Sequence, residues 1–166
     1  DMYAKTAIEG IIENLAEIRT KRCLPNDMQK SLICANMAGI AFSNAGCATM
    51  HALSFPLSAN YNLSHGEAVY AVFGCVLEYY RLLGVKLDKL EKVLSIAFND
   101  KHDPILNLLN LLKDIYDCPD LKTIGVTYQE CERMATSVYE NQQRLLVNSP
   151  ITLNPDDLAD IYKNCL

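Results

Sequence analysis

The chain has 166 residues, of which 50% are hydrophobic and 21% are charged, and its net charge is −5. This length suits one compact domain with a buried core, and this composition is typical of a soluble globular protein. Because the positive charges are scattered along an acidic chain, we expect no nucleic-acid-binding surface.

The cysteines and the first residues bear on where the protein works. Seven cysteines, an odd number, form no CxxC pair, and several lie in apolar runs. This usage favours reduced thiols over a disulfide framework. Charged residues run through the opening DMYAKTAIEGIIENL, so no signal peptide is expected and we predict a cytoplasmic protein. Residue 1 is aspartate, which leaves open a piece of a longer protein or the removal of a start methionine.

Helical patterns dominate the first third of the chain. Five apolar residues form one stripe at helical spacing and predict the first helix: Ala7, Ile8, Ile11, Ile12 and Leu15. The next helix is expected to start at Pro25-Asn26-Asp27 and to run through SLICANMAGIAFSNAG. Its many small residues would let a neighbouring helix approach its backbone closely.

Capping signals predict the later helices. Ser64-x-x-Glu67 is a capping box before the apolar run AVYAVFGCVL, and Thr127-x-x-Glu130 is another, expected to open a long helix through Leu146. Asp103-Pro104 and Asn154-Pro155 each place an N-cap residue before a proline at the first helical position. Alternating strand patterns are nearly absent. We predict an all-α fold of about seven or eight helices without a sheet.

Residues 31–66 contain no formally charged side chain when histidine is counted as neutral. A membrane span needs about 18–20 continuous apolar residues, and embedded asparagines, serines and Pro56 interrupt this run. We therefore expect no membrane segment here. An uncharged run with embedded polar groups suits a buried segment that lines a cavity.

Two of the three histidines, His51 and His65, bracket the segment HALSFPLSANYNLSH. We predict that His51 lies late in a helix that begins near Cys47, that Pro56 and the following residues form a turn, and that His65 opens the next helix. Such a segment folds back and brings the two imidazoles together. Two neutral imidazoles suit Fe(II), Zn or Ni, but such ions usually take three or four protein ligands. The residues alone therefore leave open a metal site or two hydrogen-bonded histidines.

The segment AGIAFSNAGCATMHALSFPLSANYNLSHGEA, residues 38–68, resembles the signature region of the iron-containing (group III) alcohol dehydrogenases. The chain's last helical segments, around residues 139–146 and 161–163, resemble the 4-hydroxybutyrate dehydrogenase-like branch. The resemblance implies that His51 and His65 are ligands of Fe(II) or Zn(II). It also implies a dehydroquinate synthase-like helical fold.

The resemblance further implies an organisation. Residues 1–166 correspond to the C-terminal, metal-binding helical domain, and an N-terminal nucleotide-binding domain with a glycine-rich turn is expected outside this chain. The family's other two ligands, an aspartate and a histidine four residues later, are expected on a preceding helix. Asp1 and Lys5 have that spacing, but lysine is not a metal ligand at neutral pH.

One position departs from the family. Phe55 stands where many relatives have a third histidine near the nicotinamide and the substrate, so we assign it to the cofactor-binding region. A phenyl ring cannot relay a proton. Phe55 therefore implies either another relay, a changed substrate preference or a packing role. Tyr61 is a further candidate to reach the cleft beside His65.

Two functions of different classes are compatible with this resemblance. The first is an NAD(P)-dependent alcohol dehydrogenase that reduces a short aldehyde such as succinic semialdehyde to 4-hydroxybutyrate, with the isolated chain inactive. The alternative is a stand-alone, non-catalytic helical binding domain that keeps the fold without the complete metal site. The expected partners are the nucleotide-binding domain, a small aldehyde or alcohol, and a second copy through exposed apolar surface.

Overall fold

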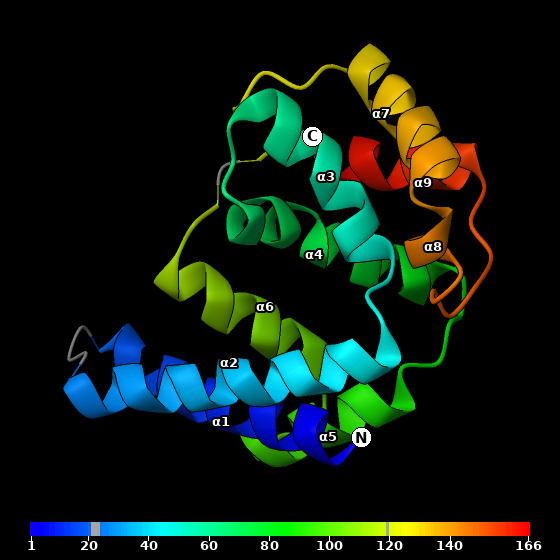
Figure 1. The fold of residues 1–166 in the computed structure, drawn as a ribbon. Helices are drawn as coiled ribbons and strands as arrows, with labels where there is room; N and C mark the ends of the chain where they lie inside the picture. The colour runs from blue at the N-terminus through cyan, green and yellow to red at the C-terminus, as the bar shows by residue number, and fades with distance from the viewer. Residues whose placement is uncertain (21–23, 119) are drawn as a thin grey trace. The chain divides into compact units, whose positions relative to one another are not determined.

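Helices form all the regular structure in the part of the chain that the computed structural model describes, residues 1–20, 24–118 and 120–166 (Figure 1). These residues contain nine helices and no strand, which confirms the predicted all-α class. The helix predicted to run through Leu146 is in fact two, because Gln142 leaves helical geometry with φ −119° and ψ 24°. The extra helix arises at this break.

The chain folds into two compact units, each made from two separate stretches of sequence. Unit 1 comprises Asp1–Ala45 and Leu87–Asp117, and unit 2 comprises Gly46–Lys86 and Cys118–Leu166. The helices of unit 1 are α1 (Met2–Arg19), α2 (Pro25–Ala45), α5 (Asp88–Phe98) and α6 (Pro104–Ile115). Those of unit 2 are α3 (Thr49–Tyr61), α4 (His65–Leu82), α7 (Tyr128–Asn141), α8 (Gln143–Leu146) and α9 (Pro155–Asn164).

In unit 1, α1 and α2 lie side by side (Figure 1). Ala7 and Ile12 of the predicted α1 stripe are buried. Gly10 of α1 faces α2 so closely that a β-carbon there would lie 2.6 Å from the Cys34 sulfur. The close helix approach expected from the small residues of α2 is thus present, and a glycine on the partner helix permits it.

A buried polar contact fastens the same two helices. Asn14, only 3% exposed, donates from Nδ2 to the Asp27 carbonyl at 2.9 Å and to the Ser31 hydroxyl. The Asp27 carboxylate in turn accepts from the Leu24 backbone N–H at 2.7 Å, which satisfies a donor at the start of α2. One α1 amide therefore fixes the register of the first turn of α2.

Replacing Asn14 with alanine is expected to lower the free energy of unfolding by roughly 1–3 kcal/mol, because two hydrogen bonds are lost inside a buried contact. Chemical denaturation followed by circular dichroism measures the change. Asn36→Ala, at an exposed position of the adjoining helix, is the matched control and should change stability by less than about 0.5 kcal/mol. Equal effects of the two substitutions would contradict the role given to Asn14.

In unit 2 the predicted caps are present. Ser64 with Glu67 and Thr127 with Glu130 form complete capping boxes at the starts of α4 and α7. Asn154 caps α9 through the Asp156 and Asp157 backbone N–H groups. The core of the unit is apolar and contains several fully buried large side chains from four helices: Leu53, Leu57, Val72, Val76, Val138, Leu158, Ile161 and Tyr162.

The expectation of reduced thiols fails at one pair. Cys75 of α4 and Cys165 at the end of α9 form a disulfide across a sequence separation of 90 residues. The two helices pack together in unit 2 and bring the Cα atoms to 5.9 Å, within the range a disulfide requires. The pairing depends on tertiary packing, so residue spacing could not reveal it. Cys34, Cys47 and Cys131 are free thiols.

The turn predicted at Pro56 is wrong, because α3 continues through that proline to Tyr61. An internal proline costs a helix about 3 kcal/mol. Here Leu53 and Leu57, on either side of it, are fully buried, and the buried Tyr162 hydroxyl donates to the Leu53 carbonyl at 2.5 Å. Tertiary packing thus outweighs the local preference. The turn comes at Asn62, which caps α3 in the left-handed conformation with φ 55°.

None of the helices among the described residues meets, by itself, the length and hydropathy criteria for a membrane span. Helices α2 and α3 meet them only when they are joined as one bent pair.

Candidate metal site

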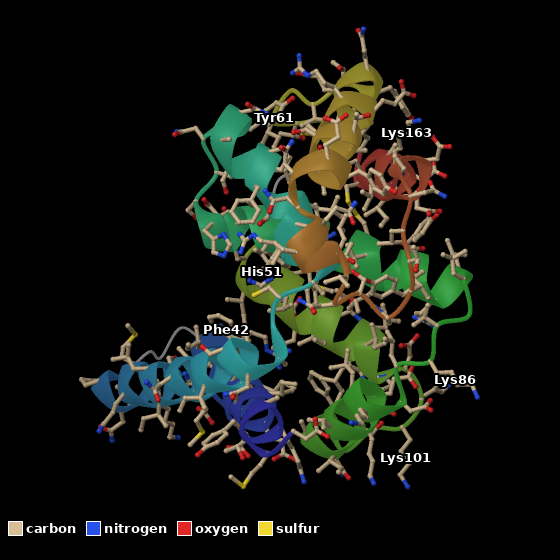
Figure 2. All side chains as sticks on the ribbon, turned by 45° about the vertical axis from the view of Figure 1, so that its right-hand side comes forward. Phe42, His51, Tyr61, Lys86, Lys101 and Lys163 are labelled. Carbon is tan, nitrogen blue, oxygen red and sulfur yellow. A yellow bond between two sulfur atoms is a disulfide. The ribbon has the colours of Figure 1, made fainter. Side chains whose placement is uncertain are left out.

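The structure brings His51 and His65 together, as predicted. His65 is the first residue of α4, as predicted. His51 lies in the first turn of α3 and not late in it, because the helix predicted to begin near Cys47 continues to Tyr61. Their ring centroids are 5.4 Å apart and the ring planes are inclined by 50°. Figure 2 labels His51 and Tyr61, which lie towards opposite ends of α3.

The capping box of α4 positions His65. The Glu67 carboxylate accepts from the Ser64 backbone N–H at 3.0 Å and from the Ser64 hydroxyl at 2.7 Å. The prediction that Glu67 serves the cap is confirmed. Because Ser64 directly precedes His65, this cap sets where the imidazole leaves the backbone.

A buried hydroxyl network positions the first turn of α3. The Thr49 hydroxyl lies 2.6 Å from the Tyr80 hydroxyl and 2.5 Å from the Ser149 hydroxyl. Thr49 is fully buried and stands two residues before His51. The Ser54 hydroxyl also donates to the His51 carbonyl at 2.8 Å. Hydrogen bonds of residues before and after His51 therefore hold the helical turn from which its side chain extends.

The electrostatics favour a neutral imidazole at His51. Burial, and secondarily the neighbouring His65, lower the pKa of His51 below its ordinary value of 6.5. At neutral pH His51 is therefore unprotonated, which is the form that binds a metal ion. Two imidazoles on one ion, with metal–nitrogen bonds of about 2 Å, would have centroids on the order of 5 Å apart. The observed separation fits that arrangement.

The described part of the chain adds no third metal ligand to this histidine pair. Residues 1–20, 24–118 and 120–166 contain no group of three or more histidine, cysteine, aspartate or glutamate side chains that could hold a metal ion. The described residues thus offer two ligands.

Phe55 lies one helical turn after His51 on the same face of α3, and its side chain is 41% exposed. It borders a groove of about 320 Å³ between α3 and α7, within unit 2. The helix α7 side of this groove consists of Ser137, Val138, Asn141 and Gln142. The sequence reasoning missed these α7 residues, since no motif marks them and only the packing of α7 on α3 brings them to Phe55.

Tyr61 is a poor candidate for a general base. Burial, and secondarily the nearby Glu130 carboxylate, raise the pKa of Tyr61 to about 12. The phenol therefore stays protonated at neutral pH and is not a general base there.

A family comparison matches the whole chain. The family model for the C-terminal part of the Fe-containing alcohol dehydrogenases matches residues 1–166. The 4-hydroxybutyrate dehydrogenase of Clostridium kluyveri is 34% identical over 171 residues, which cover 98% of this chain and 45% of that protein. The chain belongs to the iron-containing alcohol dehydrogenase family. This confirms the resemblance seen in residues 38–68.

A second curated relative is less similar to this chain. Long-chain-alcohol dehydrogenase 1 of Geobacillus thermodenitrificans is 28% identical over 153 residues, covering 83% of this chain and 37% of that protein. The chain thus spans less than half the length of these curated relatives.

Solved structures share the fold. A 1,3-propanediol oxidoreductase superposes with a TM-score of 0.82 at 22% identity, covering 100% of this chain and 45% of that structure. An archaeal halo-thermophilic alcohol dehydrogenase from a Red Sea brine pool superposes with a TM-score of 0.83 at 20% identity, covering 100% of this chain and 44% of that structure. Both likenesses establish the helical architecture.

Proposed function

We propose that this chain is the metal-holding helical part of an NAD(P)-dependent alcohol dehydrogenase, with His51 and His65 as ligands of Fe(II) or Zn(II). The single observation that carries the proposal is the approach of these two imidazoles to 5.4 Å in a chain of this family. A bound metal ion of this kind supplies a Lewis acid that polarises the carbonyl oxygen of an aldehyde.

The chain's own residues would act by positioning. His51, neutral because burial and His65 lower its pKa, offers a lone pair without first losing a proton. The Ser64–Glu67 cap and the Thr49 hydroxyl network hold the two backbones from which the imidazoles extend. Phe55 lies one turn from His51, and we assign its ring to the wall that faces the nicotinamide and the substrate.

We take the substrate to be a short aldehyde, with succinic semialdehyde as the example, and the product to be the alcohol. The support is the 34% identity to a 4-hydroxybutyrate dehydrogenase. The purified 166-residue chain, supplied with NADH or NADPH and succinic semialdehyde, is expected to show no turnover. Measurable turnover by this chain would overturn that part of the proposal.

The proposed partner is a nucleotide-binding domain, in line with relatives that are about twice as long as this chain. Helix α2 offers apolar side chains for such a contact: Leu32 is 70% exposed and Phe42 is 54% exposed. A second copy of the chain is the other partner that this surface suits.

The alternative function is a non-catalytic helical domain that keeps the family fold. The observation in its favour is that the described residues bring together two potential ligands and no third. A domain of this kind would not hold a metal ion at the histidine pair.

A zinc titration distinguishes the two functions, since only the first of them requires a metal ion at His51 and His65. The chain has three histidines, and each gives its own imidazole NMR signals. Adding Zn(II) at pH 7.5 is expected to shift the signals of His51 and His65. His51→Ala or His65→Ala should each weaken binding at least tenfold, since one imidazole cannot replace a pair.

His102→Ala is the matched control for the titration. His102 lies on the exposed loop before α6, so this substitution should leave zinc affinity unchanged. If zinc shifts none of the signals, or shifts those of His102 alone, the metal assignment fails and the non-catalytic function gains.

A further inference from the structure

A second groove lies in unit 1, on helices that carry neither histidine of the pair. Helices α1 and α5 pack together there (Figure 1). The space between them is about 480 Å³, and small-molecule sites commonly enclose about 300–1,000 Å³. Its lining comes from residues between 1 and 8, at the start of α1, and between 89 and 96, in α5. We call this space the α1–α5 groove.

The floor of the α1–α5 groove is apolar. Six side chains form it, three from each helix: Met2, Ala4, Ile8, Leu90, Val93 and Ile96. Those of α5 follow one another at three-residue intervals, so they lie on one side of that helix. The floor is far from covered, since Met2 is 69% exposed and Ile96 is 56% exposed. Apolar surface that is gathered in a concave site, and not scattered singly, indicates that an apolar group binds there.

The rim of the α1–α5 groove is positively charged. Three of its residues are lysines, Lys5, Lys89 and Lys92, and Asp1 is the only acidic residue in the described lining. Lys89 pairs with Asp1 at 2.9 Å, and Lys5 lies 3.8 Å from Glu9. The first pair is almost fully exposed and the second is long, so neither contributes much and both lysines are able to bind another anion. Lys92 has no ion-pair partner in the part of the chain that the structure describes.

The charged and the apolar parts of the groove lie at different ends. The three lysines fall within the first five residues of their helices, and the ion pair between Asp1 and Lys89 places these two helix starts next to each other. Ile8 and Ile96 follow about one turn later on each helix. Other acidic residues at the start of α5, Asp88 among them, do not line the groove. The groove therefore suits a molecule with an anionic head and an apolar tail.

We propose that the α1–α5 groove binds a medium-chain carboxylate, a molecule with one carboxylate on an unbranched saturated tail. The carboxylate contacts the lysines at the start of the two helices, and the tail lies over the apolar floor towards Ile8 and Ile96. The α5 side of the floor is roughly 10 Å long, and an extended chain advances about 1.2 Å per bond, so a tail of about eight carbons spans it. This site needs neither the metal ion nor the nucleotide of the proposed dehydrogenase.

Titration of the ¹⁵N-labelled chain at pH 7.5, followed by amide NMR, tests the site with octanoate, butyrate and octan-1-ol. Octanoate is expected to shift the signals of residues 2–8 and 89–96 and to saturate at one molecule per chain. Its Kd should be at least about fivefold lower than that of butyrate, which has half the tail, and that of octan-1-ol, which has no charge. Raising the salt concentration should reduce the preference over octan-1-ol, because salt screens exposed charges.

Two substitutions separate the role of the charge from that of the floor. Lys92→Gln should weaken octanoate by roughly threefold and leave octan-1-ol unchanged, because it removes one exposed positive charge. Ile96→Asn should weaken both probes, because it removes part of the apolar floor. Lys101→Gln and Leu106→Asn are the matched controls and should change neither affinity, since both side chains are exposed in unit 1 and do not line the groove.

The proposal is overturned if octanoate shifts no groove signal, if octanoate and octan-1-ol bind equally, or if Lys92→Gln and Lys101→Gln have equal effects. Groove signals that move with protein concentration in the absence of any probe would identify a second copy of the chain as the occupant instead. Shifts that appear only with vesicles of phosphatidylglycerol and phosphatidylcholine would identify a lipid surface. Because this titration contains no metal ion, its failure and the failure of zinc binding at His51 and His65 are separate results.

Discussion

Reducing the Cys75–Cys165 disulfide is expected to lower the free energy of unfolding by roughly 4–5 kcal/mol. The bridge joins residues 90 positions apart, and the stabilisation from restricting the unfolded chain grows with the length of the closed loop. Both cysteines belong to unit 2, while the stretch Leu87–Asp117 between them folds in unit 1. The bridge therefore ties the two sequence stretches of unit 2 to each other directly.

Guanidinium unfolding of the oxidised and the reduced chain measures this contribution. The double variant Cys75→Ala/Cys165→Ala should unfold near the midpoint of the reduced wild type, and reductant should not change it further. The buried free thiol Cys131 provides the control, since Cys131→Ala should retain the full response to reductant. If the wild type unfolds at the same midpoint with and without reductant, the two cysteines are not bridged in solution.

The bridge also illustrates what local sequence signals can and cannot predict. Caps are local, so Ser64, Thr127 and Asn154 could be identified as helix starts from a side chain and its neighbour three residues later. The disulfide depends on how α4 and α9 pack, and no spacing in the sequence encodes that. The same holds for the groove, where α3 and α7 meet.

The turn predicted at Pro56 is wrong for a related reason. A proline does weaken a helix, and this local effect can be predicted from the sequence. What it could not show is the burial of Leu53 and Leu57 and the Tyr162 hydrogen bond, which together keep α3 intact. The meeting of His51 and His65 was nevertheless predicted, because the capped start of α4 and the reversal before it both lie within a few residues of His65. The reversal simply occurs at Asn62 instead of Pro56.

Gly46, the last residue of the AGIAFSNAG stretch, leads directly into the turn that holds His51. Its φ of +79° lies in the left-handed region that favours glycine. A β-carbon at this position would lie 2.6 Å from Asn148 Nδ2, and that same nitrogen donates to the Cys47 carbonyl at 2.9 Å. A side chain at Gly46 would therefore both strain the backbone and displace the group that anchors the next residue.

Gly46→Ala is expected to lower the free energy of unfolding by roughly 2–3 kcal/mol, about 1–2 from the left-handed backbone and about 1 from the lost Asn148 hydrogen bond. Two glycines of unit 2 separate these causes. Gly84 has φ +69° but open space around a β-carbon, so Gly84→Ala should show only the backbone cost. Gly66 has neither a positive φ nor a close neighbour, so Gly66→Ala should change stability little.

A double-mutant cycle isolates the contact with Asn148. Asn148→Ala removes both the obstructing nitrogen and its hydrogen bond, so adding Gly46→Ala to that background should cost no more than Gly84→Ala costs alone. If Gly46→Ala is as mild as Gly84→Ala in the wild-type background, Asn148 moves aside freely and does not hold the turn. If the larger cost appears and Asn148→Ala relieves it, the glycine is required because a carboxamide anchors the backbone that leads into α3. The glycine that ends the family's signature helix would then help to place the first histidine of the pair.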